Sequence, residues 1–123
     1  MNLVDSSGWL EYFIEGTNAS FFAAAIEDSD HLICSSISIF EVFRMVLSNR
    51  DENAALSAIA AMQTARVIDI DTGLATMGAK FCVEYGLTPT DALVLATARS
   101  LEATLWTQKA SFQQIQGVRY ITK

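Results

Sequence analysis

The feature that most constrains this chain is the alternation of short apolar segments with longer segments of helical periodicity. The short segments suit buried strands, and apolar residues between them recur at the spacing of one helix face. Strands that alternate with helices predict a parallel sheet covered by helices on both faces, a three-layer α/β/α sandwich. The expected strands span residues 3–4, 31–34, 66–70, 103–107 and 118–121.

Length and composition indicate one globular domain over residues 1–123, because 51% of the residues are hydrophobic and only 18% are charged. A net charge of −6 disfavours a protein that grips phosphates by electrostatics alone, although a nucleic acid can still be reached through a bound cation. No signal peptide or membrane span is recognisable, so we expect a cytoplasmic protein without membrane contact. His31 is the only histidine, and Cys34 and Cys82 suit buried reduced thiols, so these residues predict no zinc site.

The first expected strand ends abruptly in a carboxylate. Leu3 and Val4 suit a buried strand in the middle of the sheet, and Asp5 follows them directly. In open α/β sheets, ligands bind beyond the carboxyl ends of the strands, where the strand order reverses. We therefore expect Asp5 on the functional edge.

Other polar residues stand where helices are expected to begin. Asp5 and Asn18 are placed to cap the first two helices. Ser38-Ile39-Phe40-Glu41 and Thr88-Pro89-Thr90-Asp91 both have the spacing of a capping box. Each acid taken alone is explained by such a helix-start role.

Taken together, the acids predict a metal site. Helices that follow parallel strands begin at the carboxyl edge, so Asp5, Glu41 and Asp91 should converge there. Carboxylates held close together repel, and a cation between them relieves the repulsion. Hard oxygen ligands favour Mg²⁺ or Mn²⁺, ions that activate water and neutralise charge on a phosphodiester.

Three segments resemble the acidic motifs of PIN-domain ribonucleases, most of all the VapC toxins of toxin–antitoxin pairs. They are residues 2–13, 38–44 and 87–98, and residues 105–108 and 117–120 extend the likeness over nearly the whole chain. The resemblance implies a five-stranded, mostly parallel PIN-like sheet, Mg²⁺-dependent endoribonuclease activity on RNA and a small DNA-binding antitoxin as partner. It assigns the metal to Asp5, Glu41 and Asp91, and it places the hydroxyl of Thr107 beside that metal.

The chain departs from this family at one place. Lys109 and Ser111 occupy positions where the family usually has aspartates. A cation therefore replaces an anion, which predicts one strongly held ion at most. Lys109 is expected either to contact the scissile phosphate or to point into solvent.

Two further expectations concern Arg44 and the oligomeric state. Arg44 follows Glu41 by three residues, which predicts a helical ion pair that also orients Glu41. Abundant aromatic and aliphatic residues on the early helices predict a homodimer, with the antitoxin laying an apolar helix in a groove.

Two other readings of the sequence stay open. One is a catalytically weakened PIN-like module that binds its antitoxin, with or without RNA, and does not cleave. The other is a receiver-type signalling domain with Asp69 or Asp71 as phosphoacceptor, although such domains carry a pair of acids after the first strand and here Ser6 and Ser7 follow Asp5.

Overall fold

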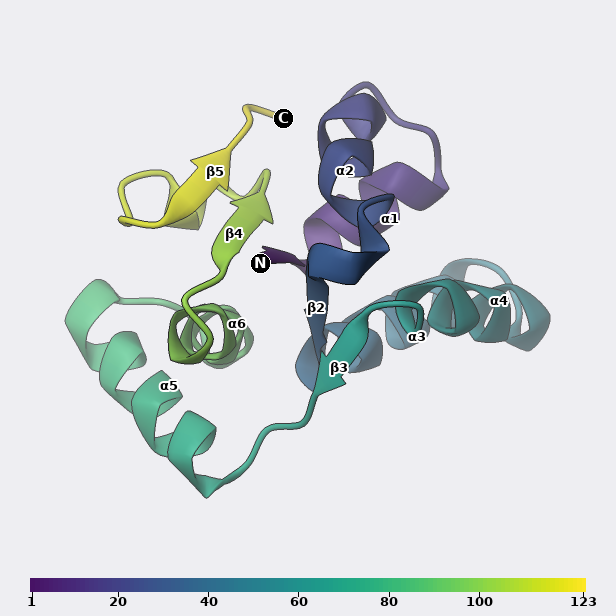
Figure 1. The fold of residues 1–123 in the computed structure, drawn as a ribbon. Helices are drawn as coiled ribbons and strands as arrows, with labels where there is room; N and C mark the ends of the chain where they lie inside the picture. The colour runs from purple at the N-terminus through teal and green to yellow at the C-terminus, as the bar shows by residue number, and fades with distance from the viewer.

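A five-stranded parallel sheet forms the centre of the computed structural model, which describes residues 1–123. The strand order is β3-β2-β1-β4-β5, so the first strand of the chain is the middle strand of the sheet (Figure 1). This confirms the predicted parallel sheet and the central place of the first strand. The strands are β1 (Asn2–Val4), β2 (Leu32–Ser35), β3 (Arg66–Ile68), β4 (Thr104–Thr107) and β5 (Val118–Tyr120).

Helices cover both faces of the sheet, as predicted. Successive strand residues point to opposite faces, so Val4 enters a core with Trp9 and Phe22, whereas Leu3 enters a second core with Leu95. Helices α1 to α4 line the first core, while α5 and α6 line the second (Figure 1). The helices are α1 (Ser6–Phe13), α2 (Ala19–Ile26), α3 (Ser36–Asn49), α4 (Glu52–Met62), α5 (Thr72–Tyr85) and α6 (Pro89–Ser100).

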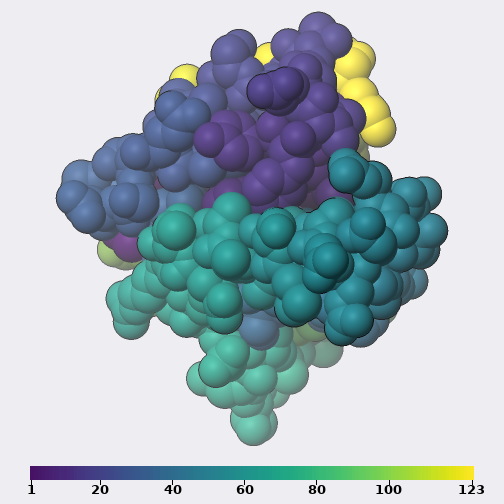
Figure 2. Space-filling model, turned by 90° about the vertical axis from the view of Figure 1, so that its right-hand side faces the viewer, coloured from purple at the N-terminus to yellow at the C-terminus, as the bar shows by residue number.

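Figure 2 shows the molecule from the side of the helices that line the first core. On this face the purple N-terminal residues adjoin the teal residues of the α4 region. None of the helices is both long and apolar enough to cross a membrane.

Two of the expected helix starts are confirmed. The Asp5 carboxylate accepts a hydrogen bond from the Gly8 amide at 3.0 Å and caps α1. The Thr88 hydroxyl accepts one from the Asp91 amide at 3.4 Å, and Pro89 is the first residue of α6. Both acids thus begin helices at the carboxyl ends of the strands.

The capping box predicted at Ser38–Glu41 is wrong. Helix α3 begins directly after β2, and the Ser35 hydroxyl accepts a hydrogen bond from the Ile37 amide at 3.3 Å. The chain therefore enters the helix three residues earlier than the motif suggests. Ser38 lies inside the helix with its buried hydroxyl unpaired, and Glu41 lies beyond the first turn.

The cap predicted at Asn18 is also wrong. Its side-chain amide donates to the Gln108 side chain at 2.9 Å and to the Thr122 carbonyl at 3.1 Å instead of capping α2. These bonds tie the start of α2 to the segments that follow β4 and β5.

Candidate active site

The sheet reverses its strand order between β1 and β4. The chain builds β2 and β3 on one side of β1, then crosses to place β4 and β5 on the other. This is the kind of position at which open α/β sheets bind ligands. Val4 pairs with Trp106 in the ladder, so the next residues, Asp5 and Thr107, lie side by side at the carboxyl edge.

Asp5 is held there by several hydrogen bonds. Thr107 Oγ1 donates to its Oδ2 at 2.6 Å, and Ser7 Oγ donates to its Oδ1 at 2.6 Å, beside the capping bond from Gly8. The residue is only 2% exposed. Burial raises the pKa of Asp5 above its ordinary value, although the hydrogen bonds from Ser7, Thr107 and Gly8 and the charge of Lys109 oppose that rise. The side chain is therefore both desolvated and fixed in orientation.

Asp91 is the second buried acid of this edge, 7% exposed in the first turn of α6. Lys109 Nζ contacts its Oδ1 at 2.8 Å, and Ser111 Oγ donates to its Oδ2 at 3.3 Å. Both carboxylate oxygens are therefore engaged by the segment that follows β4. The contact between Lys109 and Asp91 also shows that this lysine does not simply point into solvent.

The Lys109 ammonium contacts Asp91 directly, and the charges of Asp5 and Glu41 also act on it. Burial alone would lower the pKa of Lys109, but the hydrogen bond and charge of Asp91, with the charges of Asp5 and Glu41, outweigh it and raise that pKa. Its backbone amide donates to Thr107 Oγ1 at 3.0 Å, the same hydroxyl that binds Asp5. Lys109 thus links the surroundings of the two buried aspartates.

Glu41 lies at the same edge without a bond to either aspartate. It is half-buried on α3 and lines a recess with Ser6, Ser7 and Lys109. The structure thus brings Asp5, Thr107, Lys109 and Asp91 into one bonded group and leaves Glu41 beside it.

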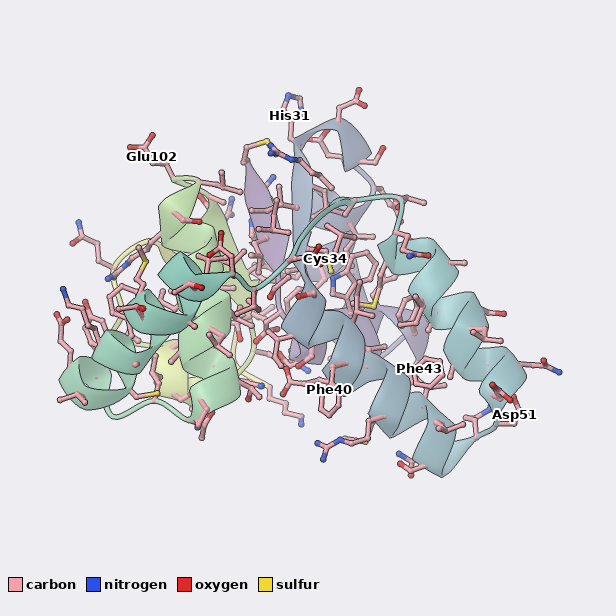
Figure 3. The ribbon with its side chains drawn as sticks, turned by 90° about the horizontal axis from the view of Figure 1, so that it is seen from below. His31, Cys34, Phe40, Phe43, Asp51 and Glu102 are labelled. Carbon is pink, nitrogen blue, oxygen red and sulfur yellow. The ribbon has the colours of Figure 1, made fainter.

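Arg44 does not form the predicted ion pair with Glu41. The ion pair that a lysine or arginine forms in this chain joins Lys109 to Asp91 instead. The Arg44 guanidinium lies instead over the Phe40 ring, 5.8 Å from its centroid, an attraction that needs no carboxylate. Phe40 is 57% exposed, and Figure 3 shows it on the outside of α3, whereas Phe43 lies on the side of α4.

The donor set suits a hard cation, because it offers carboxylate and hydroxyl oxygens and no thiolate or imidazole. The carboxylates are less accessible to a metal ion than their chemistry alone suggests. No three side chains among the His, Cys, Asp and Glu residues are placed to hold one metal ion, and an ammonium sits on Asp91. One Mg²⁺ or Mn²⁺ site shared by Asp5, Glu41 and Asp91 therefore stays a prediction.

Sequence reasoning missed Ser7 and Gln108 at this edge. The Ser7 hydroxyl donates to the Asp5 carboxylate from two residues away, so this contact is local in the chain. The Gln108 side chain donates to the Ser7 carbonyl at 3.4 Å and accepts from Asn18. The spacing of Asp5 and Ser7 is a usable signal for the first contact, whereas the second joins residues distant in the chain.

Several solved structures of similar fold come from toxin–antitoxin systems. A toxin–antitoxin complex from Klebsiella pneumoniae superposes with a TM-score of 0.79 at 23% identity, over 97% of this chain and 96% of that one. DNA-bound VapBC from Salmonella typhimurium gives 0.76 at 17% identity, over 99% and 98%. Mycobacterium tuberculosis VapC20, described as a sarcin–ricin loop cleaving toxin, gives 0.78 at 16% identity, over 94% and 95%.

A comparison with curated proteins found no match. The family model of the PIN domain matches residues 3–118, nearly the full length of the chain. That span contains the parallel sheet, the strand-order reversal and both buried aspartates. The chain therefore belongs to the PIN-domain family, and its fold is that of the VapC toxins.

Proposed function

We propose that this chain is a Mg²⁺- or Mn²⁺-dependent endoribonuclease and the toxin of a toxin–antitoxin pair. One observation carries the proposal: two buried aspartates, Asp5 and Asp91, stand at the strand-order reversal of a PIN-domain sheet. Burying two acids is costly, and helix capping needs neither to be this deeply enclosed. Membership of the PIN-domain family favours phosphodiester hydrolysis as the reason that these two aspartates are buried.

In this proposal each residue of the site has its own role. Asp5 and Asp91 hold the metal, with Glu41 acting directly or through water. The bound ion supplies positive charge to the phosphodiester and lowers the pKa of a water. Thr107 and Ser7 keep the Asp5 carboxylate in place through their 2.6 Å bonds. Arg44 and Lys123 line the same recess as Glu41, where they offer charge to flanking phosphates of the RNA.

Cleavage of a labelled RNA in Mg²⁺ tests the nuclease. Asp5→Asn and Asp91→Asn should each lower the rate by about a hundredfold or more, since an amide carries no charge to hold the ion. Glu102→Gln is the matched control, because it neutralises an exposed acid just beyond the other end of α6. Wild-type rates in both aspartate variants would refute the proposal.

A second candidate function is binding without cleavage. The ion pair between Lys109 and Asp91 favours it, because it occupies an oxygen that the metal needs. Under this alternative the wild type binds RNA in a filter assay but leaves it intact in Mg²⁺ and in Mn²⁺. Cleavage by the wild type that Asp91→Asn abolishes would exclude it.

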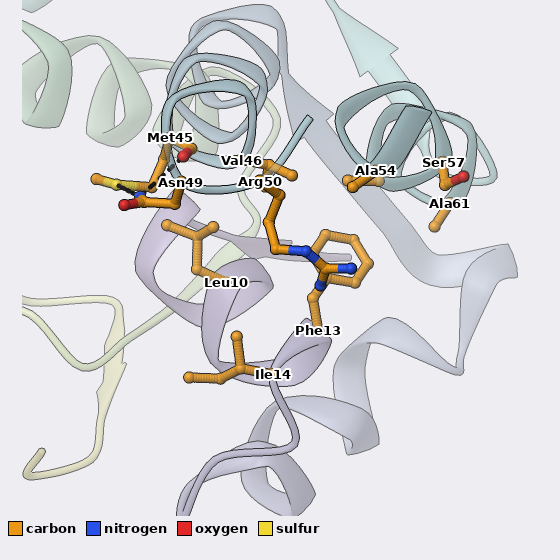
Figure 4. Close-up of a pocket in the computed structure, with 11 residues that line it drawn as sticks. Leu10, Phe13, Ile14, Met45, Val46, Asn49, Arg50, Ala54, Ser57 and Ala61 are labelled. Atoms are coloured by element: carbon orange, nitrogen blue, oxygen red, sulfur yellow. Dashed lines mark hydrogen bonds between the residues drawn. The ribbon is translucent and has the colours of Figure 1, made fainter. Parts of the chain in front are cut away.

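The proposed antitoxin site is an apolar groove between α1, α3 and α4. The groove has a volume of about 770 Å³, and Leu10, Phe13, Ile14 and Met45 are among its lining residues (Figure 4). Ile14 is 72% exposed and Met45 43% exposed, which is unusual for large apolar side chains gathered in one groove. An apolar helix is the occupant that such a groove suits.

The groove also leads toward the acidic edge. Leu10, Ile14 and Met45 line both the groove and the recess that contains Glu41 and Lys109. A segment leaving the groove along this path can place an arginine against the carboxylates, where a charge-assisted bond is strong. The antitoxin would then block the site that it neutralises.

Copurification with the product of the adjoining reading frame tests this assignment. Ile14→Lys and Met45→Lys should each release that partner, because a charge in the apolar groove is costly to bury. Val83→Lys, at a position 89% exposed on α5, is the control. Retention of the partner by both groove variants would contradict the assignment.

A homodimer remains part of the proposal. Exposed apolar side chains outside the groove, among them Phe40 and Leu56, offer contact surface. Sedimentation at several concentrations, with and without the partner, tests it, and a persistent monomer would count against it.

A further inference from the structure

We propose that the Lys109 ammonium is a tethered counter-ion of the acidic edge, and that a divalent ion binds only by displacing it from Asp91. The metal in this inference rests on the proposed function, whereas the role of Lys109 rests on the contacts described above. Lys109 acts in this view as an internal competitor of the metal.

The first support is how firmly the lysine is placed. The Lys109 side chain is 31% exposed and that of Asp91 only 9%, so their 2.8 Å contact is largely shielded from water. The backbone of Lys109 is anchored by its 3.0 Å bond to the Thr107 hydroxyl. Shielded ion pairs are lost only at considerable cost, unlike exposed ones, which contribute little.

The second support is that both oxygens of the Asp91 carboxylate already have partners. Lys109 takes one of its oxygens and Ser111 the other. Magnesium binds carboxylate oxygens at about 2.1 Å, and an ammonium already in contact with the same oxygen repels an arriving cation. The bond between Lys109 and Asp91 must therefore break, or shift, before Asp91 ligates a metal.

The third support is the charge balance. Asp5, Glu41 and Asp91 carry three negative charges when ionised, and the Lys109 ammonium, held on Asp91, supplies one positive charge. Two negative charges then remain, which one divalent ion neutralises. A second divalent ion would leave two surplus positive charges at the edge, against one if Lys109 were absent, so the lysine disfavours a second ion.

Metal binding to the free protein tests this role without relying on activity. Lys109→Met keeps a long side chain but removes the charge, and Lys123→Met does the same to a lysine that lines the same recess without an ion pair. Manganese affinity is measured by electron paramagnetic resonance, and the rise in Tm by thermal unfolding with and without Mg²⁺.

Lys109→Met should bind Mn²⁺ about tenfold more tightly than the wild type, and Mg²⁺ should raise its Tm further. Lys123→Met should match the wild type. Lys109→Arg keeps the positive charge and should bind Mn²⁺ as weakly as the wild type does. This variant provides a comparison if Lys109→Met folds poorly.

Equal Mn²⁺ affinity in the wild type and Lys109→Met would overturn the competition while leaving a metal-dependent nuclease intact. Failure of both proteins to bind Mn²⁺ would overturn the competition and the metal-dependent function together. Tight binding by Lys109→Arg would also overturn the inference, because a retained cation must compete.

Discussion

At the scale of single residues, Asp5 combines two roles that a substitution can separate. Its carboxylate caps α1 through the Gly8 amide, and its charge lies buried at the carboxyl edge. Asp5→Asn keeps an oxygen for the cap and removes the charge, whereas Asp5→Ala removes both. We expect Asp5→Ala to lose about 1–2 kcal/mol of unfolding free energy relative to Asp5→Asn. Urea unfolding of the two variants measures this difference, and equal stabilities would show that the cap contributes nothing.

The raised pKa of Asp5 also predicts a pH dependence. A raised pKa means that the folded protein holds this proton more tightly than the unfolded chain does. The resulting stabilisation is fully present below the unfolded-state pKa and is lost as the pH rises through the folded-state pKa.

The side chain introduced by Asp5→Asn is neutral at every pH, so this variant does not lose stability as the pH rises through the pKa of Asp5. Its stability relative to the wild type should therefore increase from acid toward neutral pH, as urea unfolding across that range would measure. A difference that stays constant with pH would mean that burial does not perturb Asp5.

At the scale of elements, two glycines in different helices make a matched test of packing. A Cβ added at Gly8 in α1 would lie 2.6 Å from the Phe22 ring and from Val4 Cγ1, so α1 packs on α2 and β1 only because Gly8 has no side chain. Gly8→Ala should lose about 1–3 kcal/mol of unfolding free energy through overpacking, more than the helix propensity of alanine restores.

Gly73 in α5 is the control, because its nearest neighbour would be Asp71 Oδ1 at an ordinary 3.5 Å. Gly73→Ala should gain up to about 1 kcal/mol through propensity alone. Thermal and urea unfolding compare the two variants, and a stabilised Gly8→Ala would contradict the packing argument.

The start of α3 supplies a second test at this scale. Ser35 caps the helix, while the Ser38 hydroxyl is buried without a partner. Ser35→Ala should therefore cost about 1 kcal/mol of stability, and Ser38→Ala should be neutral or stabilising. If urea unfolding shows that Ser38→Ala costs more stability than Ser35→Ala, the capping box predicted at Ser38–Glu41 is supported instead.

These elements also show what the sequence could predict. Leu3 and Val4 before Asp5, and Thr88 before Pro89, predicted a central strand and a helix start correctly, because burial and capping there depend on neighbouring residues. The start of α3 was misplaced because Ser38 has the capping-box spacing to Glu41, whereas the exit of the chain from β2 makes Ser35 the cap.

For the candidate site, the parallel sheet was sufficient to predict Asp5 at the carboxyl edge, whereas Thr107 was expected beside it only from the resemblance to PIN-domain ribonucleases. The contact of Lys109 with Asp91 was not predictable, because it depends on the path of the loop after β4. The bond between Asn18 and Gln108 joins residues far apart in the chain, and no local pattern encodes it.

At the scale of the whole molecule, a net charge of −6 constrains the RNA binding that the proposed nuclease function requires. Phosphate contacts must come from the few basic residues near the acidic edge, and Arg44, Lys109 and Lys123 line the recess there. Each phosphate neutralised on a single strand contributes about −0.7 to the slope of log K against log salt. Three contacts predict a slope of about −2, and about −1.4 if Lys109 stays on Asp91.

Arg44→Gln should therefore make this slope shallower by about 0.7, as measured by RNA binding in EDTA, where metal-dependent cleavage is prevented. Arg66→Gln is the control, because Arg66 is an exposed residue at the start of β3 and so lies at the amino ends of the strands, the opposite edge of the sheet. Both variants lose the same charge, so long-range effects of net charge are equal between them. A slope that changes equally in both would mean that the RNA is not bound along the recess, whereas a change confined to Arg44→Gln places the phosphates beside Glu41 and Lys109.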